Sequence, residues 1–63
     1  MKEKFTWADC DIIHETSSAV LVKKNDDEFW FPFSHVERIV RSKEPGKSQI
    51  VVTAWIAKKK GLL

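Results

Sequence analysis

Short apolar runs separated by turn-forming residues most constrain what this chain can fold into. A β-branched run at 19–23 and an aromatic run at 29–31 flank the polar segment 25–28, whose Asn and Asp side chains favour a turn. This pattern predicts two strands joined as a β-hairpin. A Pro-Gly pair at 45–46 separates two further strand candidates, 39–41 and 49–52, and predicts a second hairpin.

Residues 4–14 alternate between apolar and polar side chains and favour a strand. The alternation changes phase between Trp7 and Cys10, which predicts a bulge or a strand break there. Beyond that point Cys10 and His14 fall on one face of the strand. At the rise of a strand they are about 13 Å apart, so we do not expect them to share a metal ion or a proton.

The segment after the aromatic run is expected to turn before it forms another strand. Pro32 cannot donate a hydrogen bond to a sheet, so the strand should end there or lie at an edge. Ser34 and Glu37 fit a capping box. This spacing predicts one helical turn or tight bend that runs into a strand.

The C-terminal residues predict a short helix. Thr53 can cap the first turn of a helix over residues 54–60, and Gly61 would follow the C-cap so that Leu62 folds back on Ile56. With the strands, this predicts a mainly β fold. We expect about five antiparallel strands in a curled sheet or small open barrel, OB-like or Src-homology-like, with a short C-terminal helix.

The size and composition indicate one small domain over residues 1–63, because 63 residues with 43% hydrophobic content leave room for a single core. Cys10 is the sole cysteine and cannot form an internal disulfide, so packing, or packing plus self-association, must hold the domain together. No apolar run approaches the roughly 20 residues of a membrane span, and the first residues do not read as a secretory signal. We expect a cytoplasmic protein without membrane contact.

The chain offers few groups for catalysis or metal binding. One Cys and two His are too few for a zinc site, and the acidic segment 26–28 lacks the spacing and glycine of a calcium loop. No glycine-rich phosphate loop or G-x-S-x-G elbow is present. Ser34 and His35 are neighbours, which point to opposite faces of an extended backbone. We therefore expect a protein that is not an enzyme and needs no metal or cofactor.

Charge is unevenly distributed along the chain. Residues 1–28 hold four basic and seven acidic side chains, a net charge of −3, whereas residues 29–63 hold seven basic and two acidic ones, a net charge of +5. The second hairpin and the helix, if packed side by side, would gather the seven cations on one positive face. These cations are Arg38, Arg41, Lys43, Lys47, Lys58, Lys59 and Lys60.

Aromatic rings beside cations are the arrangement that binds single-stranded nucleic acid, since bases stack on rings while lysines contact phosphates. A chain this small needs most of its rings for the core. We expect a structural role for Trp7, Phe29, Phe31 and Trp55, and exposure for Trp30 and Phe33. The leading hypothesis is a non-enzymatic module that contacts single-stranded DNA or RNA through Trp30, Phe33, Arg38, Arg41 and Lys47.

The alternative hypothesis is a protein-binding inhibitor or adaptor that acts on a host protein, alone or as a homodimer. The same exposed aromatic residues would then be interface hot spots, and the two charged halves would steer docking. Unpaired strand edges would allow homodimers to form by sheet extension. The two hypotheses differ in one observable, because phosphate-driven binding weakens steeply with salt whereas an apolar contact does not.

Two segments resemble small bacteriophage proteins. Residues 29–36 read FWFPFSHV and residues 50–62 read IVVTAWIAKKKGL, which is similar to an aromatic-apolar-Pro-x-Ser pattern followed by a strand and a Trp-apolar-Ala, Lys-Gly-Leu ending. The resemblance implies a phage or prophage accessory protein that works in the host cytoplasm. It implies no particular activity. Phe33 stands where a polar residue would be expected in that pattern, which points to a local contact surface.

Overall fold

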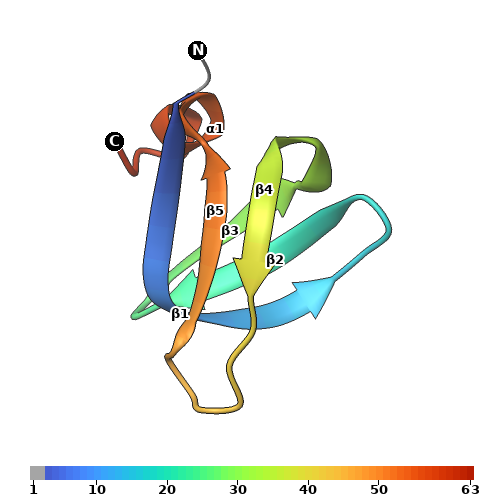
Figure 1. The fold of residues 1–63 in the computed structure, drawn as a ribbon, viewed down its shortest axis with the longest axis vertical. Coiled ribbons are helices and arrows are strands. Elements are labelled where there is room, and N and C mark those ends of the chain that lie inside the picture. The colour runs from blue at the N-terminus through green and yellow to red at the C-terminus, as the bar shows by residue number, and fades with distance from the viewer. Residues whose placement is uncertain (1–2) are drawn as a thin grey trace.

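A computed structural model describes residues 3–63 and contains one five-stranded antiparallel sheet with a short helix at its C-terminal end (Figure 1). The elements are β1 (Lys4–Glu15), β2 (Ala19–Lys24), β3 (Asp27–Pro32), the 3-10 turn η1 (Phe33–His35), β4 (Val36–Val40), β5 (Ser48–Thr53) and α1 (Ala54–Lys59). The strand order is β3-β2-β1-β5-β4, and within residues 3–63 no pairing joins the edge strands β3 and β4. The predicted mainly β fold with a C-terminal helix is confirmed, and the sheet of residues 3–63 does not close into a barrel. Met1 and Lys2 of the predicted domain lie outside the described residues.

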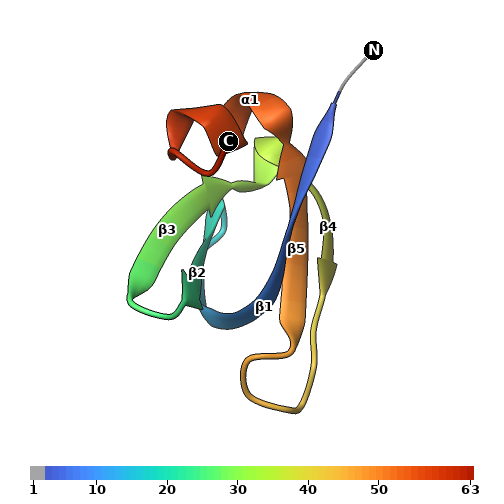
Figure 2. The same cartoon turned by 90° about the vertical axis from the view of Figure 1, so that its left-hand side faces the viewer.

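Strand β1 belongs to both halves of the sheet because it bends at a β-bulge. Its first half, from Lys4 to Trp7, pairs with β5, and its second half, from Asp11 onward, pairs with β2. The register shifts between Trp7 and Cys10, where Asp9 has a φ of 55°. A bulge bends its strand and increases the local twist, and Figures 1 and 2 show β1 curving so that the β2–β3 hairpin faces β4 and β5. The predicted bulge is confirmed.

The hydrophobic core fills the space between these two halves, and α1 covers one end of it (Figure 2). The ring of Trp7 meets Phe29 and Phe31 edge-on, with centroid distances of 5.6 and 6.1 Å. The structural role predicted for these three rings is confirmed. The buried side chains are Trp7, Cys10, Val20, Val22, Phe31, Ile50, Val52, Ile56 and Ala57.

Both predicted hairpins form, with differences in detail. The first turn is shorter than predicted: β3 already begins at Asp27, because Asn25 adopts a left-handed conformation (φ 57°) that lets a two-residue turn close the hairpin. Pro32 ends β3 at the sheet edge, as predicted. The capping box at Ser34 is wrong. Within the described chain η1 follows directly from Pro32, and no side chain caps its first turn.

The C-terminal helix forms as predicted and is capped at both ends. The Oγ1 atom of Thr53 accepts a hydrogen bond from the amide of Ile56 at 3.3 Å. At the other end Gly61 takes a φ of 77°, and the amides of Gly61 and Leu62 donate to carbonyls of the last turn at 3.1 and 2.8 Å. This is the Schellman arrangement, and it lays Leu62 against the core. No helix in residues 3–63 is long and apolar enough to cross a membrane.

Candidate functional site

The most exposed aromatic side chain is that of Trp55 in the first turn of α1, with 55% of its surface accessible. The prediction that this ring belongs to the core is wrong. The buried side of α1 consists of Ala54, Ile56 and Ala57, and two alanines on that side bring the helix backbone close to the sheet. Trp55 is not on this buried side, and its ring lies on the outer side of the helix.

The ring of Trp55 makes one aromatic contact and one contact with a cation. The imidazole of His35 stacks on it with a centroid distance of 4.8 Å and an interplanar angle of 24°. The ammonium group of Lys59 lies over the ring, 4.8 Å from its centroid, which is within the range of a cation–π interaction. An aromatic pair and a cation are therefore held together at the surface.

His35 is held in place by the residue that caps α1. Its Nδ1 atom lies 3.1 Å from the Oγ1 atom of Thr53, the same oxygen that accepts the amide of Ile56. A hydroxyl group can both accept and donate hydrogen bonds, so the same side chain of Thr53 serves the helix amide and the imidazole. The cap of the helix thus also orients the ring that stacks on Trp55.

A cleft of about 430 Å³ opens beside this pair of rings, and we call it the α1 cleft. Its wall combines the two rings with one ammonium group and one carboxylate. Such a mixture can contact a flat aromatic ligand and a charged group at the same time. The cleft is lined by Glu3, Ser34, His35, Thr53, Ala54, Trp55 and Lys58.

Trp30 is exposed, as the sequence predicts, with 42% of its surface accessible. It lies on β3 between two phenylalanines that pack on the core, and its ring meets His14 edge-on at 6.2 Å. Asp26 lies in the adjoining β2–β3 turn, and Asp27 and Glu28 begin β3, where they pair with Lys24 and Lys23 of β2. The ring of Trp30 therefore lies outside the α1 cleft, on a hairpin that carries both acidic and basic side chains.

The other predicted contact residues are distributed over the fold. Phe33 is half-buried and packs against the core, so its predicted exposure is wrong in large part, because η1 turns its ring inward. Arg38 is exposed on β4, at the opposite edge of the sheet from Trp30 on β3. Lys47 is exposed in the loop between β4 and β5, and Arg41 begins that loop. The structure does not gather these five residues on one surface.

The expected single positive face does not form either. The helix follows β5 and lies at the end where that strand finishes, whereas the loop 41–47 lies at the end where it begins (Figure 1). A six-residue strand separates the two groups by about 20 Å. The side-by-side packing that a single positive face requires is therefore not observed. The cations of the loop and of the helix lie at opposite ends of β5, and Arg38 lies on β4 between them.

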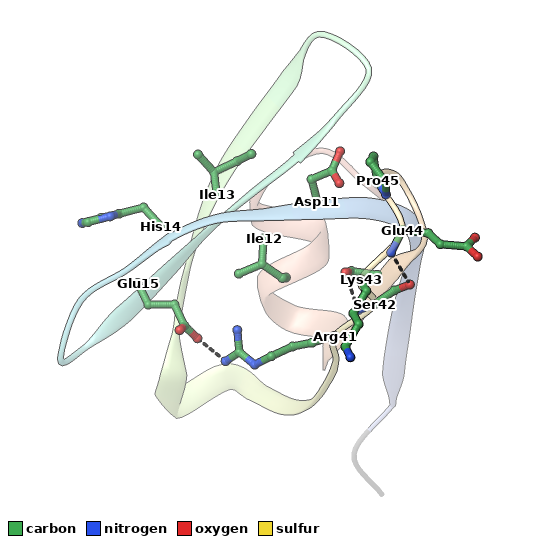
Figure 3. A pocket seen from close by; sticks show the side chains of 11 residues that line it. Asp11, Ile12, Ile13, His14, Glu15, Arg41, Ser42, Lys43, Glu44 and Pro45 are labelled. Atoms are coloured by element: carbon green, nitrogen blue, oxygen red, sulfur yellow. Dashed lines mark hydrogen bonds and ion pairs between the residues drawn. The ribbon is translucent and has the colours of Figure 1, made fainter.

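A second hollow of about 650 Å³ lies between the second half of β1 and the β4–β5 loop (Figure 3). Arg41 forms an ion pair with Glu15 across it, and the carboxylate of Asp11 accepts the amide of Gly46 at 2.7 Å. Ile13 also lines this hollow and is 49% exposed. The charged groups that line this hollow are partly engaged with one another, which makes it a weaker candidate site than the α1 cleft.

The thiol of Cys10 has a structural role. It is fully buried and its Sγ atom lies 3.4 Å from the carbonyl oxygen of Trp7 and 3.3 Å from that of Ser48, so it links the bulge to β5. Burial raises the pKa of this thiol above its ordinary value. His14 does not share its face: a second register shift between Ile12 and His14 turns the imidazole outward, so that prediction is wrong.

Among residues 3–63, no three His, Cys, Asp or Glu side chains come together in a way that could hold a metal ion. No protein-family model, curated protein or solved structure matches the chain. The resemblance of residues 29–36 and 50–62 to phage accessory proteins stays a prediction. The assignment of function accordingly rests on the rings and charges of the α1 cleft.

Proposed function

We propose that this protein is a non-enzymatic binding module for single-stranded nucleic acid and that the α1 cleft is its contact site. The observation that carries this proposal is the exposed indole of Trp55, stacked on His35 at 4.8 Å and covered by the ammonium group of Lys59. A base stacked on an aromatic side chain contributes about 1–3 kcal/mol, and neighbouring lysines neutralise the phosphates. The α1 cleft offers both contacts.

The binding step follows from the relative strength of two contacts on the same ring. An exposed cation–π interaction is worth about 0.5–1 kcal/mol, less than the stacking of a base. A base can therefore displace Lys59 from Trp55, and the released ammonium group is then free to contact a phosphate. His35 keeps its stacking contact with Trp55, because its hydrogen bond to Thr53 holds it in place.

Single strands are the expected form of the ligand. The bases of a duplex are stacked and paired with one another, so a lone indole on a short helix has no unpaired base face to meet. Three consecutive lysines at the end of α1, residues 58–60, can follow a flexible backbone. The chain has a net charge of +2, so binding should depend on stacking as well as on charge.

The test is the fluorescence anisotropy of a labelled ten-nucleotide oligo-dT, the matching RNA and a duplex, titrated at about 50 and 200 mM salt. The Trp55→Ala variant is compared with Trp30→Ala, which removes the other exposed indole. We expect Trp55→Ala to weaken single-strand binding about fivefold or more and Trp30→Ala to leave it unchanged. Equal effects of the two variants, or no binding at the lower salt, would overturn the proposal.

The contribution of charge is measured separately. Replacing Lys58 and Lys59 with alanine should lower the slope of log K against log salt by about 1.4, since each phosphate contact with a single strand contributes about 0.7. The matched control replaces Lys43 and Lys47, the two lysines of the β4–β5 loop at the other end of the molecule. We expect this control to leave the slope unchanged, and a larger effect of the control would move the site to that loop.

A second candidate function, a protein-binding adaptor, is favoured by a different observation. Trp30 and Ile13 are 42% and 49% exposed, although both are large apolar side chains, and such residues are anchors of protein interfaces. Sheet extension is the less suitable route to a partner, because Pro32 and charged side chains stand on the edge strands. Binding of a protein through Trp30 that persists at 200 mM salt would support this candidate.

A further inference from the structure

We infer that the α1 cleft selects guanine among the bases of a single strand and that Glu3 is the residue that reads it. This inference rests on the proposed function and names the ligand of the same site. Glu3 lines the cleft together with Trp55 and Lys58. A carboxylate repels phosphates, so in a site for a polyanion it is useful where it meets the edge of a base.

The position of Glu3 is set by the backbone. Its carbonyl oxygen accepts a hydrogen bond from the amide of Ala54, the first residue of α1, at 2.9 Å. The next residue, Lys4, pairs with Thr53 at the start of the β1–β5 ladder. The backbone of Glu3 is thus anchored beside the helix cap that also orients His35, and its exposed side chain lines the α1 cleft.

The chemistry of the carboxylate singles out one base. An ionised carboxylate has two acceptor oxygens and no donor. The Watson–Crick edge of guanine presents two adjacent donors, N1–H and the N2 amino group, which match these oxygens. Adenine, cytosine and thymine each place an acceptor beside their donor, and that acceptor would face a carboxylate oxygen. In a single strand this edge is free to be read.

The two contacts of the cleft are compatible with one nucleotide. The flat face of the base can stack on Trp55 while its edge meets Glu3, and Lys58 lines the same cleft as a partner for a phosphate. Stacking accepts any base. The preference for guanine therefore comes from Glu3, and removal of its charge should remove the preference without removing binding.

The test uses labelled nine-nucleotide strands in which the central base is thymine, guanine, inosine, adenine or cytosine and the eight flanking nucleotides are abasic, so that no other base competes for the cleft. A bidentate contact to a base discriminates about fivefold or more, so we expect the guanine strand to bind about fivefold more tightly than the adenine and cytosine strands. Inosine keeps N1–H but lacks the N2 amino group, and its strand should bind with intermediate affinity. The Glu3→Gln variant should lose the preference for guanine, because its amide offers one donor and one acceptor in place of two acceptors.

The Glu44→Gln variant is the matched control. It removes the same charge from the exposed β4–β5 loop, and only backbone atoms of Glu44 make hydrogen bonds to the described residues. We expect it to keep the preference for guanine. Equal binding of all strands by the unaltered protein, or a preference that survives in Glu3→Gln, would overturn the role of Glu3. Tight binding to oligo-dT in that case would leave the proposed function standing, so the two failures are distinguishable.

Discussion

Replacing Thr53 with alanine should destabilise the fold and loosen the α1 cleft at the same time, because one oxygen serves both. The Oγ1 atom accepts the amide of Ile56 at 3.3 Å and lies 3.1 Å from Nδ1 of His35. Loss of a helix N-cap costs about 1 kcal/mol, and loss of a side-chain hydrogen bond costs about 1 kcal/mol more. The Thr53→Ala variant should therefore lose about 2 kcal/mol of unfolding free energy.

This loss is large for so small a domain. A core of this size supplies about 3–5 kcal/mol of net stability, and 1 kcal/mol corresponds to about 4–8 °C in Tm, so the variant should melt about 8–16 °C lower. The assay is urea unfolding followed by far-ultraviolet circular dichroism. Oligo-dT binding is then measured at a temperature where the variant is folded, and it should be weaker because His35 is no longer held behind Trp55.

Thr53→Ser keeps the hydroxyl group and should lose only a few tenths of a kcal/mol. Combining each substitution with His35→Ala separates the two bonds, since the coupling between Thr53 and His35 should be about 1 kcal/mol. Equal stability of Thr53→Ala and Thr53→Ser would refute the reasoning. It would mean that neither bond contributes to the fold.

Three further predictions concern the stability of the fold. Gly61→Ala should lose about 1–2 kcal/mol of unfolding free energy, because Gly61 has a φ of 77°, which an alanine rarely adopts. A methyl group at this position would contact no other atom, so the cost is purely conformational. Urea unfolding measures the loss, and an unchanged stability would contradict the left-handed C-cap. As the pH rises above 9.0, the ordinary pKa of the thiol, the stability of the unaltered protein should fall relative to that of Cys10→Ala. Burial raises the pKa of Cys10 in the folded protein, so only the unfolded state loses the thiol proton in this range. Parallel curves of stability against pH for the two proteins would contradict this. Arg41→Ala should lose no more than about 1 kcal/mol, since its ion pair with Glu15 is solvent-exposed, and a larger loss would show that the pair supports the bend of β1.

Most of the fold could be predicted because its signals are local. Positive-φ turns at Asn and Gly, the phase change before Cys10 and the cap at Thr53 each act within a few residues, and each is observed. The second bulge, at Ile13, has no comparable signal. The residues around it alternate little in polarity. The register shift there arises from the pairing with β2, and the sequence of β1 alone carries no information on that pairing.

The candidate site was harder to predict, because it depends on which rings the core has room for. Trp55 is large and apolar, so its size indicated burial, whereas the spacing of Ala54 and Ala57 identifies the buried side of the helix. That spacing was the available signal. His35 and Glu3 lie far from Trp55 in sequence, and they join it only because β1, η1 and α1 meet at one end of the sheet.

The measurement that tests the central claim most directly is a titration of the ¹⁵N-labelled protein with oligo-dT, followed through the indole N–H signals of its three tryptophans in ¹H–¹⁵N correlation spectra. Trp7 is buried, Trp30 lies on β3 outside the α1 cleft, and Trp55 lines the α1 cleft. We predict that the signal of Trp55 shifts in a saturable manner while those of Trp7 and Trp30 stay in place. A shift of Trp30 without one of Trp55, or no shift of any indole at low salt, would contradict the account.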